Sequence, residues 1–202
     1  MEDPILWPIL LQIVLIALNA IFACAEIAII SINDNKLAQL VSQGDKRAVR
    51  LARLTSRPAQ FLATIQIAIT LSGFLGSAFA ADNFSDPLVA MLVDAGVPIP
   101  AKTLNTIAVV VITLVLSYIT LVFGELVPKR LAMKKADTLA LGLSGLISTL
   151  STICAPVVAV LTASTNGILR LLGVDPSADE DEVSEEEIKM MVDRGNEKGV
   201  FD

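Results

Sequence analysis

Charged residues are scarce in this chain of 202 residues. They make up 18% of it, against roughly 25% in soluble domains. Aromatic residues are also few, at 4%, so the 54% of hydrophobic residues consists mainly of Ala, Val, Ile and Leu. A soluble domain of this length cannot bury so much aliphatic surface, and the mean hydropathy of +0.70 therefore indicates an integral membrane protein.

Histidine is absent, which excludes Ser-His-Asp triads, imidazole–zinc sites and histidine pH switches. Cys24 and Cys154 are too few for a cysteine-rich metal cluster. The chain has no glycine-rich phosphate-binding motif and no basic, aromatic-rich stretch typical of nucleic-acid binding. Ser117 and Thr120 have no histidine or lysine base at membrane depth to activate them. We therefore expect neither an enzyme nor an organic cofactor.

Four apolar stretches are long enough to be compared with the roughly 20 residues that cross a bilayer. They are residues 4–31, 58–81, 103–124 and 138–169, and the only charged residue in them is Glu26. Their length and aliphatic composition predict helices. The expected fold class is an all-α membrane protein.

Charge in the connecting segments predicts the orientation of these stretches. Residues 32–57 carry six basic residues against two acids, residues 82–102 carry three acids against one lysine, and residues 125–135 carry four basic residues. By the positive-inside rule, the first and third segments are cytoplasmic and the N-terminus lies outside a plasma or bacterial inner membrane. The net charge of −6 belongs to residues 175–202, which carry −8.

The fourth stretch, residues 138–169, allows two paths because Pro156 lies in its middle. A single crossing would place the acidic tail outside. A bend at the proline would instead give a belt at the cytoplasmic interface or a re-entrant pair of half-helices, with the tail inside. We favour the second path: three transmembrane helices, a Pro-broken juxtamembrane belt or re-entrant helix, and a cytosolic helical tail.

Two hydrophilic segments are also predicted to be helical. Residues 34–57 have apolar residues near helical spacing, with a break at Gly44 and an end at Arg57 before Pro58. In the tail, Ser184 and Glu187 have the spacing of a capping box. We divide the chain into a transmembrane domain, 1–174, and an acidic linker with the start of a cytosolic helix, 175–202.

Polar residues inside the apolar stretches are the candidate site, because each needs a partner or water in the membrane. Asn19 and Glu26 are seven residues apart and share a helix face, as do Gln66 and Thr70, four apart, with Gly73 continuing their face. A stripe on the third stretch ends at Glu125. Its members recur at helical spacing: Thr106, Thr113, Ser117, Thr120 and Gly124.

Carboxylate, amide and hydroxyl oxygens suit hard cations such as Mg²⁺, Ca²⁺ or Na⁺. For the hydroxyl stripe taken alone, backbone bonding and helix packing are the preferred explanation. An unpaired carboxylate in hydrocarbon is costly, so Glu26 and Glu125 point more strongly to function, unless they lie at the interface. Gly124 and Pro128 predict an opened helix end beside Glu125, although a helix end with a basic anchor would look the same.

Three motifs resemble the transmembrane domain of the CNNM/CorC proteins, a family that includes hemolysin-related bacterial membrane proteins. They are FACAEIA at residues 22–28, FLATIQIAITL at 61–71 and GELVPK at 124–129, of which the last is the most specific. Residues 184–199 also resemble the segment that leads into paired CBS domains in that family. The likeness therefore runs along nearly the whole chain.

The resemblance implies three membrane helices, a belt-like juxtamembrane helix and a homodimer. It implies export of Mg²⁺ driven by Na⁺ entry, and following CBS domains, absent from these residues, that bind adenine nucleotide. Glu125 would be the central acidic ligand, with Gln66 and Thr70 lining the same cavity. The chain departs from the family pattern at Ala23, where better-understood members have serine, and in residues 66–70, where their asparagines are replaced.

Two hypotheses of function follow. In the first, the chain is a secondary transporter that binds Mg²⁺ or a similar divalent cation at a site drawn from Glu125, Gln66, Thr70, Gly124, Glu26, Asn19, Ser117 and Thr120. In the second, it is a membrane scaffold or regulator whose polar cavity no longer transports. Glu26 either adds a ligand or bridges to Lys129 or Arg130.

Overall fold

The computed structural model describes residues 6–174, whose regular elements are all helices. The chain divides into two compact units, Met1–Ala155 and Pro156–Asp202, and each is described by itself. The predicted helix in the tail lies outside the described residues. Four helical stretches among the described residues are long and apolar enough to cross a membrane, which fits a multi-pass membrane protein.

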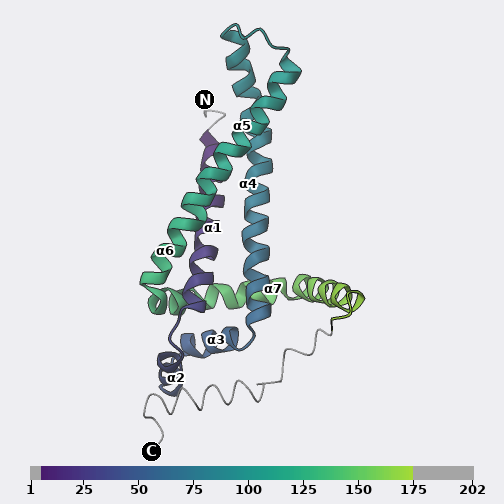
Figure 1. Cartoon of the computed structure of the whole chain (residues 1–202). Helices are drawn as coiled ribbons and strands as arrows, with labels where there is room; N and C mark the ends of the chain where they lie inside the picture. Colours follow the sequence, from purple (N-terminus) through teal and green to yellow (C-terminus); the bar gives the residue numbers. More distant parts are fainter. Residues whose placement is uncertain (1–5, 175–202) are drawn as a thin grey trace, which may run out of the picture. The chain divides into compact units, whose positions relative to one another are not determined.

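Three long helices of the first unit run side by side (Figure 1). They are α1 (Leu6–Ile30), α4 (Pro58–Asp94) and α5 (Ala101–Leu121). The 25 residues of α1 extend about 37 Å at 1.5 Å per residue, more than the roughly 30 Å of a hydrocarbon core. Its length and its content of only one charged residue, Glu26, are therefore compatible with a crossing.

Small residues allow α1 to pack closely against its neighbours. Ala23, Ala25 and Ala28 are fully buried, and the core around Ala25 and Ala28 includes Phe61 and Ile65 of α4. In lipid, helices associate through such close van der Waals contact rather than through exclusion of water. The small residues around Glu26 therefore serve mainly to pack α1 against its neighbours.

The segment between α1 and α4 is helical, as predicted. It forms α2 (Asp34–Ser42) and α3 (Lys46–Thr55), with side-chain N-caps from Asn33 and Asp45. Gly44 separates the two helices with a φ of 81°, which glycine adopts without a Cβ penalty. A side-chain hydrogen bond from Arg47 lowers the pKa of Asp45.

Helix α4 is longer than the predicted stretch 58–81. Residues 82–94, expected as part of a loop, continue the helix through the internal Pro87, and Asn83 Nδ2 donates to the carbonyl of Phe79 at 2.8 Å. The chain turns only at Gly96, which has a φ of 79°. The loop prediction rested on charge, and charge alone does not end a helix.

The third apolar stretch continues as a helix beyond its predicted end at residue 124. After α5 come the wide π-helical turn η1 (Val122–Leu126) and α6 (Val127–Lys134), with Pro128 in the first turn of α6. The predicted opening of the helix at Gly124 and Pro128 takes the form of a wider π turn and not of an unwound segment. A π turn accommodates the proline while keeping the chain helical.

Helix α7 (Ala136–Leu171) includes Pro156 in its interior. The boundary between the two units falls at this proline. In the first unit, residues 136–155 cross the ends of α1 and α4 on the side of α2 and α3 (Figure 1). Ala140, Ser144 and Ile147 are fully buried there. Ala140 and Ile147 share one core with Leu51 of α3.

Candidate functional site

Helix α1 contributes two buried amides. Gln12 and Asn19 are seven residues apart and are only 6% and 3% exposed. Gln12 Oε1 and Asn19 Oδ1 have no hydrogen-bond partner among the described residues. A buried acceptor without a partner costs about 1–3 kcal/mol, so each of these two oxygens would be stabilised by a hydrogen-bond donor.

Helix α4 brings Thr70, Gly73 and Ser77 to the same region, with Ile69 and Phe74 beside them. A Cβ built on Gly73 would meet no atom within 4 Å, which shows that this glycine borders open space. The polar positions again fall at helical spacing, since Ser77 follows Thr70 by seven residues. One face of α4 therefore carries the polar lining.

The third wall comes from α5 and the π turn, through Ser117, Thr120 and Glu125. Pro128 has no N–H to offer the carbonyl of Gly124, four residues earlier, and Asn19 Nδ2 donates to that carbonyl at 3.1 Å. A Cβ on Gly124 would lie 3.1 Å from Asn19 Nδ2. The glycine thus lets α1 approach the π turn closely enough for this hydrogen bond.

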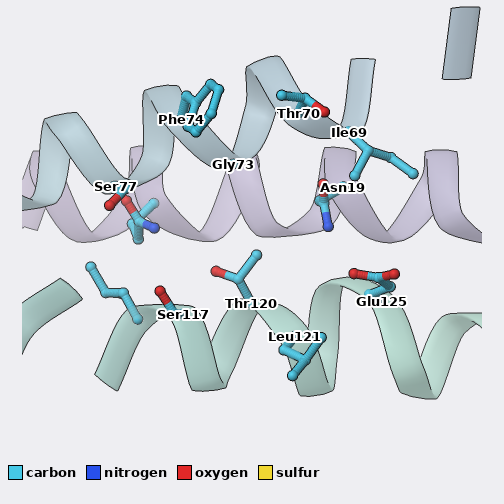
Figure 2. Close-up of a pocket in the computed structure, with 12 residues that line it drawn as sticks. Asn19, Ile69, Thr70, Gly73, Phe74, Ser77, Ser117, Thr120, Leu121 and Glu125 are labelled. Atoms are coloured by element: carbon cyan, nitrogen blue, oxygen red, sulfur yellow. The ribbon is translucent and has the colours of Figure 1, made fainter. Parts of the chain in front are cut away.

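These three walls border an open cavity of about 360 Å³. Figure 2 shows Asn19 of α1, Thr70 of α4, and Thr120 and Glu125 of the third wall around the same gap. Among the described residues that line it, Glu125 is the only ionisable one, while Leu116 and Leu121 add apolar surface. The cavity can therefore hold a cation against one carboxylate and several neutral oxygens.

A lysine lies between the two glutamates of the region. Lys129 Nζ is 3.0 Å from Glu125 Oε1 and 3.1 Å from Glu26 Oε2. The contact with Glu125 also has hydrogen-bond geometry. One ammonium group is thus shared by two carboxylates, which spares both the cost of an unpaired charge.

The structure brings together five of the eight predicted site residues. The cavity is lined by Asn19, Thr70, Ser117, Thr120 and Glu125. Gly124 is buried behind the lining, and Glu26 turns to Lys129. Gln66 is exposed and donates through Nε2 to Thr70 Oγ1 at 3.2 Å, so it adjoins the lining without being part of it.

Gln12 and Ser77 line the cavity but were not among the predicted residues. Gln12 precedes Asn19 by seven residues, the same interval that separates Asn19 from Glu26, so it lies on the same helix face. Ser77 follows Thr70 by seven residues and continues the face of Gln66 and Thr70. Both residues could therefore have been found. Thr106, in contrast, donates to the carbonyl of Lys102 in its own helix, as the packing explanation proposed.

The donor set is sparse for a bound metal ion. Within residues 6–174 there is no group of three or more Cys, Asp or Glu side chains placed to hold one. Mg²⁺ is often held by one or two carboxylates with several of its waters retained. The cavity therefore suits a partly hydrated cation better than a tightly bound, dehydrated one.

A family model described as the cyclin M transmembrane N-terminal domain matches residues 10–202. A UPF0053 protein of Synechocystis sp. is 34% identical over 189 residues, which cover 94% of this chain and 42% of the relative. The UPF0053 protein YugS of Bacillus subtilis is 30% identical over 191 residues, covering 92% and 43%.

A third relative has a functional name. The polyamine export protein of Haemophilus influenzae is 28% identical over 195 residues, covering 96% of this chain and 44% of the relative. The chain thus spans less than half the length of these curated relatives. The similarity reaches from one end of the chain nearly to the other.

Proposed function

This chain belongs to the family of cyclin M transmembrane N-terminal domains, and we propose that it transports cations across the membrane. In this proposal the cavity beside Glu125 binds Mg²⁺ or a similar divalent cation, and the protein exports it in exchange for Na⁺. The observation that carries the proposal is the convergence of one carboxylate, two unpartnered buried amide oxygens and several hydroxyls on one cavity.

The size of the cavity supports a hydrated ion. A hydration shell of six waters at about 30 Å³ each needs about 180 Å³. This is half of the cavity volume of roughly 360 Å³. Magnesium gives up its waters reluctantly, and Gln12 Oε1 and Asn19 Oδ1 can accept hydrogen bonds from waters of its shell. Glu125 would then supply the one charged contact.

Lys129 gives the site a built-in competitor. Its ammonium group already contacts Glu125 Oε1, so an arriving cation must share or displace it. Glu26 lies on the other side of Lys129 and would keep the displaced ammonium paired. In this mechanism cation binding exchanges one salt bridge for another, which limits affinity and favours release.

Sodium can use the same groups at lower charge. The single charge of Na⁺ is neutralised by one carboxylate, and the ion can take hydroxyl and carbonyl oxygens as further ligands. Thr120 and Ser117 offer such oxygens in the wall that holds Glu125. Overlapping sites for the two ions would couple Na⁺ entry to Mg²⁺ exit.

We further propose three membrane crossings with residues 136–155 as the belt. This segment packs on α3, which carries Lys46, Arg47, Arg50 and Arg53 and is unsuited to hydrocarbon. Lys36 of α2 pairs with Asp137 at the start of α7. These contacts favour a position at the cytoplasmic interface, with the N-terminus outside and the tail inside an inner or plasma membrane.

Two further proposals concern partners. The first is a homodimer, for which α5 offers large exposed apolar side chains, including Val111, Leu114 and Tyr118. The second is that CBS domains of a longer chain would bind adenine nucleotide. Both rest on the family likeness.

An organic polycation is a second candidate substrate. One relative is named a polyamine export protein, and the lining joins oxygens to the apolar surface of Ile69, Phe74 and Leu121. Such a mixed wall suits a ligand with ammonium groups on a hydrocarbon stem. Competition between Mg²⁺ and spermidine for binding would show which of the two the cavity prefers.

The test pairs two glutamate variants that share one partner. We expect Glu125→Gln to abolish saturable Mg²⁺ binding by isothermal titration and Na⁺-dependent Mg²⁺ efflux from liposomes. We expect Glu26→Gln to weaken binding without abolishing it, because this change removes the carboxylate that would keep the displaced Lys129 paired but removes none from the cavity. Unchanged binding in Glu125→Gln would contradict the proposal. An absence of saturable binding in the unmodified chain would favour a scaffold.

A further inference from the structure

A second hollow in the first unit lies apart from the cavity beside Glu125 and has the opposite charge. It is a cleft of about 280 Å³ between the α3–α4 junction and residues 148–155 of α7. Arg53 and Arg57 form one wall, and Ser148, Ser151 and Thr152 form the other; Leu54 and Phe61 are the buried apolar residues of the lining. We call it the arginine cleft.

The arginine cleft gathers hydrogen-bond donors without a balancing acid. No carboxylate is among the described residues that line it, and the ion pairs within residues 6–174 do not include Arg53 or Arg57. Each guanidinium presents a planar fork that matches two oxygens of a phosphate. The cleft is therefore built to receive an oxyanion.

The cleft is held in shape by close packing of its two walls. A Cβ on Gly145 would lie 3.9 Å from Arg50 Nη2, so the end of the Arg50 side chain reaches α7 three residues before the lining residue Ser148. Ile147 and Leu51, both fully buried, belong to the core under this contact. The arginines therefore stand on a packed framework rather than on a loose loop.

Its position in the sequence places the cleft at a membrane surface. Arg57 directly precedes α4, whose first residues lead into an apolar stretch. The basic α3 is expected on the cytoplasmic side, where anionic lipids attract such residues. Leu62 and Ile153, which follow the lining residues Phe61 and Thr152, are both exposed and offer contact for acyl chains.

We propose that the arginine cleft binds the phosphate of an anionic phospholipid from the cytoplasmic leaflet. Arg53 and Arg57 hold the phosphate oxygens, while the hydroxyls of Ser148 and Ser151 bond to the headgroup. The volume holds about nine waters at roughly 30 Å³ each, enough for a phosphodiester with part of its glycerol. The bound lipid joins α7 to the α3–α4 junction.

Native mass spectrometry of the whole chain, taken from vesicles with equal parts of phosphatidylglycerol and phosphatidylcholine, tests this. We expect retention of phosphatidylglycerol over phosphatidylcholine. In Arg53→Gln/Arg57→Gln that preference falls about tenfold. The double variant Arg53→Lys/Arg57→Lys keeps the charge but loses the planar guanidinium fork, so its preference for phosphatidylglycerol should lie between those of the unmodified chain and the glutamine variant. An intermediate preference also shows that the loss in the glutamine variant is not a folding defect. The control Lys46→Gln/Arg47→Gln removes equal charge from α3 outside the cleft and keeps the preference.

Five results would overturn the proposal. Equal retention of both lipids by the unmodified chain, or full retention of phosphatidylglycerol by the glutamine double variant, excludes a lipid site in the cleft. An equal loss in the control assigns the effect to general surface charge. Displacement of the lipid by inorganic phosphate assigns the cleft to a soluble anion, and displacement by a peptide of residues 175–202 assigns it to the acidic tail.

Discussion

The cavity beside Glu125 and the arginine cleft are hollows of comparable size, about 360 and 280 Å³, with opposite chemistry. The cavity has one carboxylate, which is held by Lys129. The cleft has two guanidinium groups and no carboxylate among its described lining residues. The positions that we propose for them account for the difference: among apolar helices a charge requires a partner, whereas at an interface water and lipid headgroups can supply it.

The two glycines of the cavity region differ in the space around them, and this allows the cavity to be filled without disturbing its walls. A Cβ on Gly73 enters open space, so Gly73→Leu should fill the cavity and abolish saturable Mg²⁺ binding while the thermal unfolding midpoint stays unchanged. Gly142→Leu is the control, since a Cβ there also meets nothing within 4 Å but lies outside the cavity. Retained binding in Gly73→Leu would place the ion elsewhere.

Gly124 has the opposite requirement. A Cβ there meets Asn19 Nδ2 at 3.1 Å and must disturb the buried hydrogen bond to the Gly124 carbonyl. We expect Gly124→Ala to lower the free energy of unfolding by about 1–3 kcal/mol, measured by thermal or denaturant unfolding in detergent. Gly142→Ala should instead be neutral or stabilising by up to about 1 kcal/mol. Equal effects of the two changes would refute a close approach of α1 to the π turn.

Removing the internal ammonium group tests whether it competes with the substrate. Lys129→Gln leaves Glu125 free for a cation, so Mg²⁺ should bind about tenfold more tightly, or about 1.4 kcal/mol, while two carboxylates without their partner make the fold less stable. Arg130→Gln, which removes the neighbouring exposed charge, should change neither. Weaker Mg²⁺ binding in Lys129→Gln would mean that the lysine organises the site instead of competing for it.

The smallest effect is expected at the surface contact between Lys36 and Asp137. Both side chains are partly exposed, so Lys36→Gln should cost no more than about 1 kcal/mol, and the cost should vanish in high salt. Unfolding midpoints at low and high ionic strength would measure it. A large, salt-independent loss would show that this pair fixes residues 136–155 more firmly than an exposed ion pair can.

Much of the site could be predicted from spacing. The residues that spacing places on polar helix faces include five that line the cavity: Asn19, Thr70, Ser117, Thr120 and Glu125. The same spacing extends to Gln12 and Ser77, which were not among the predicted residues. Spacing also grouped Gln66 with Thr70, yet Gln66 lies beside the lining, because a helix face is broad and only the part that meets a neighbour becomes a wall.

The sequence by itself determined the membrane class, the helical segments and the polar faces, because these depend on composition and on the period of one helix. N-caps at Asn33 and Asp45 and the break at Gly44 are equally local. Tertiary structure decided which faces meet. The contact of Asn19 with Gly124 and the place of Lys129 between Glu26 and Glu125 join residues about a hundred positions apart, and such contacts depend on how closely two helices can approach.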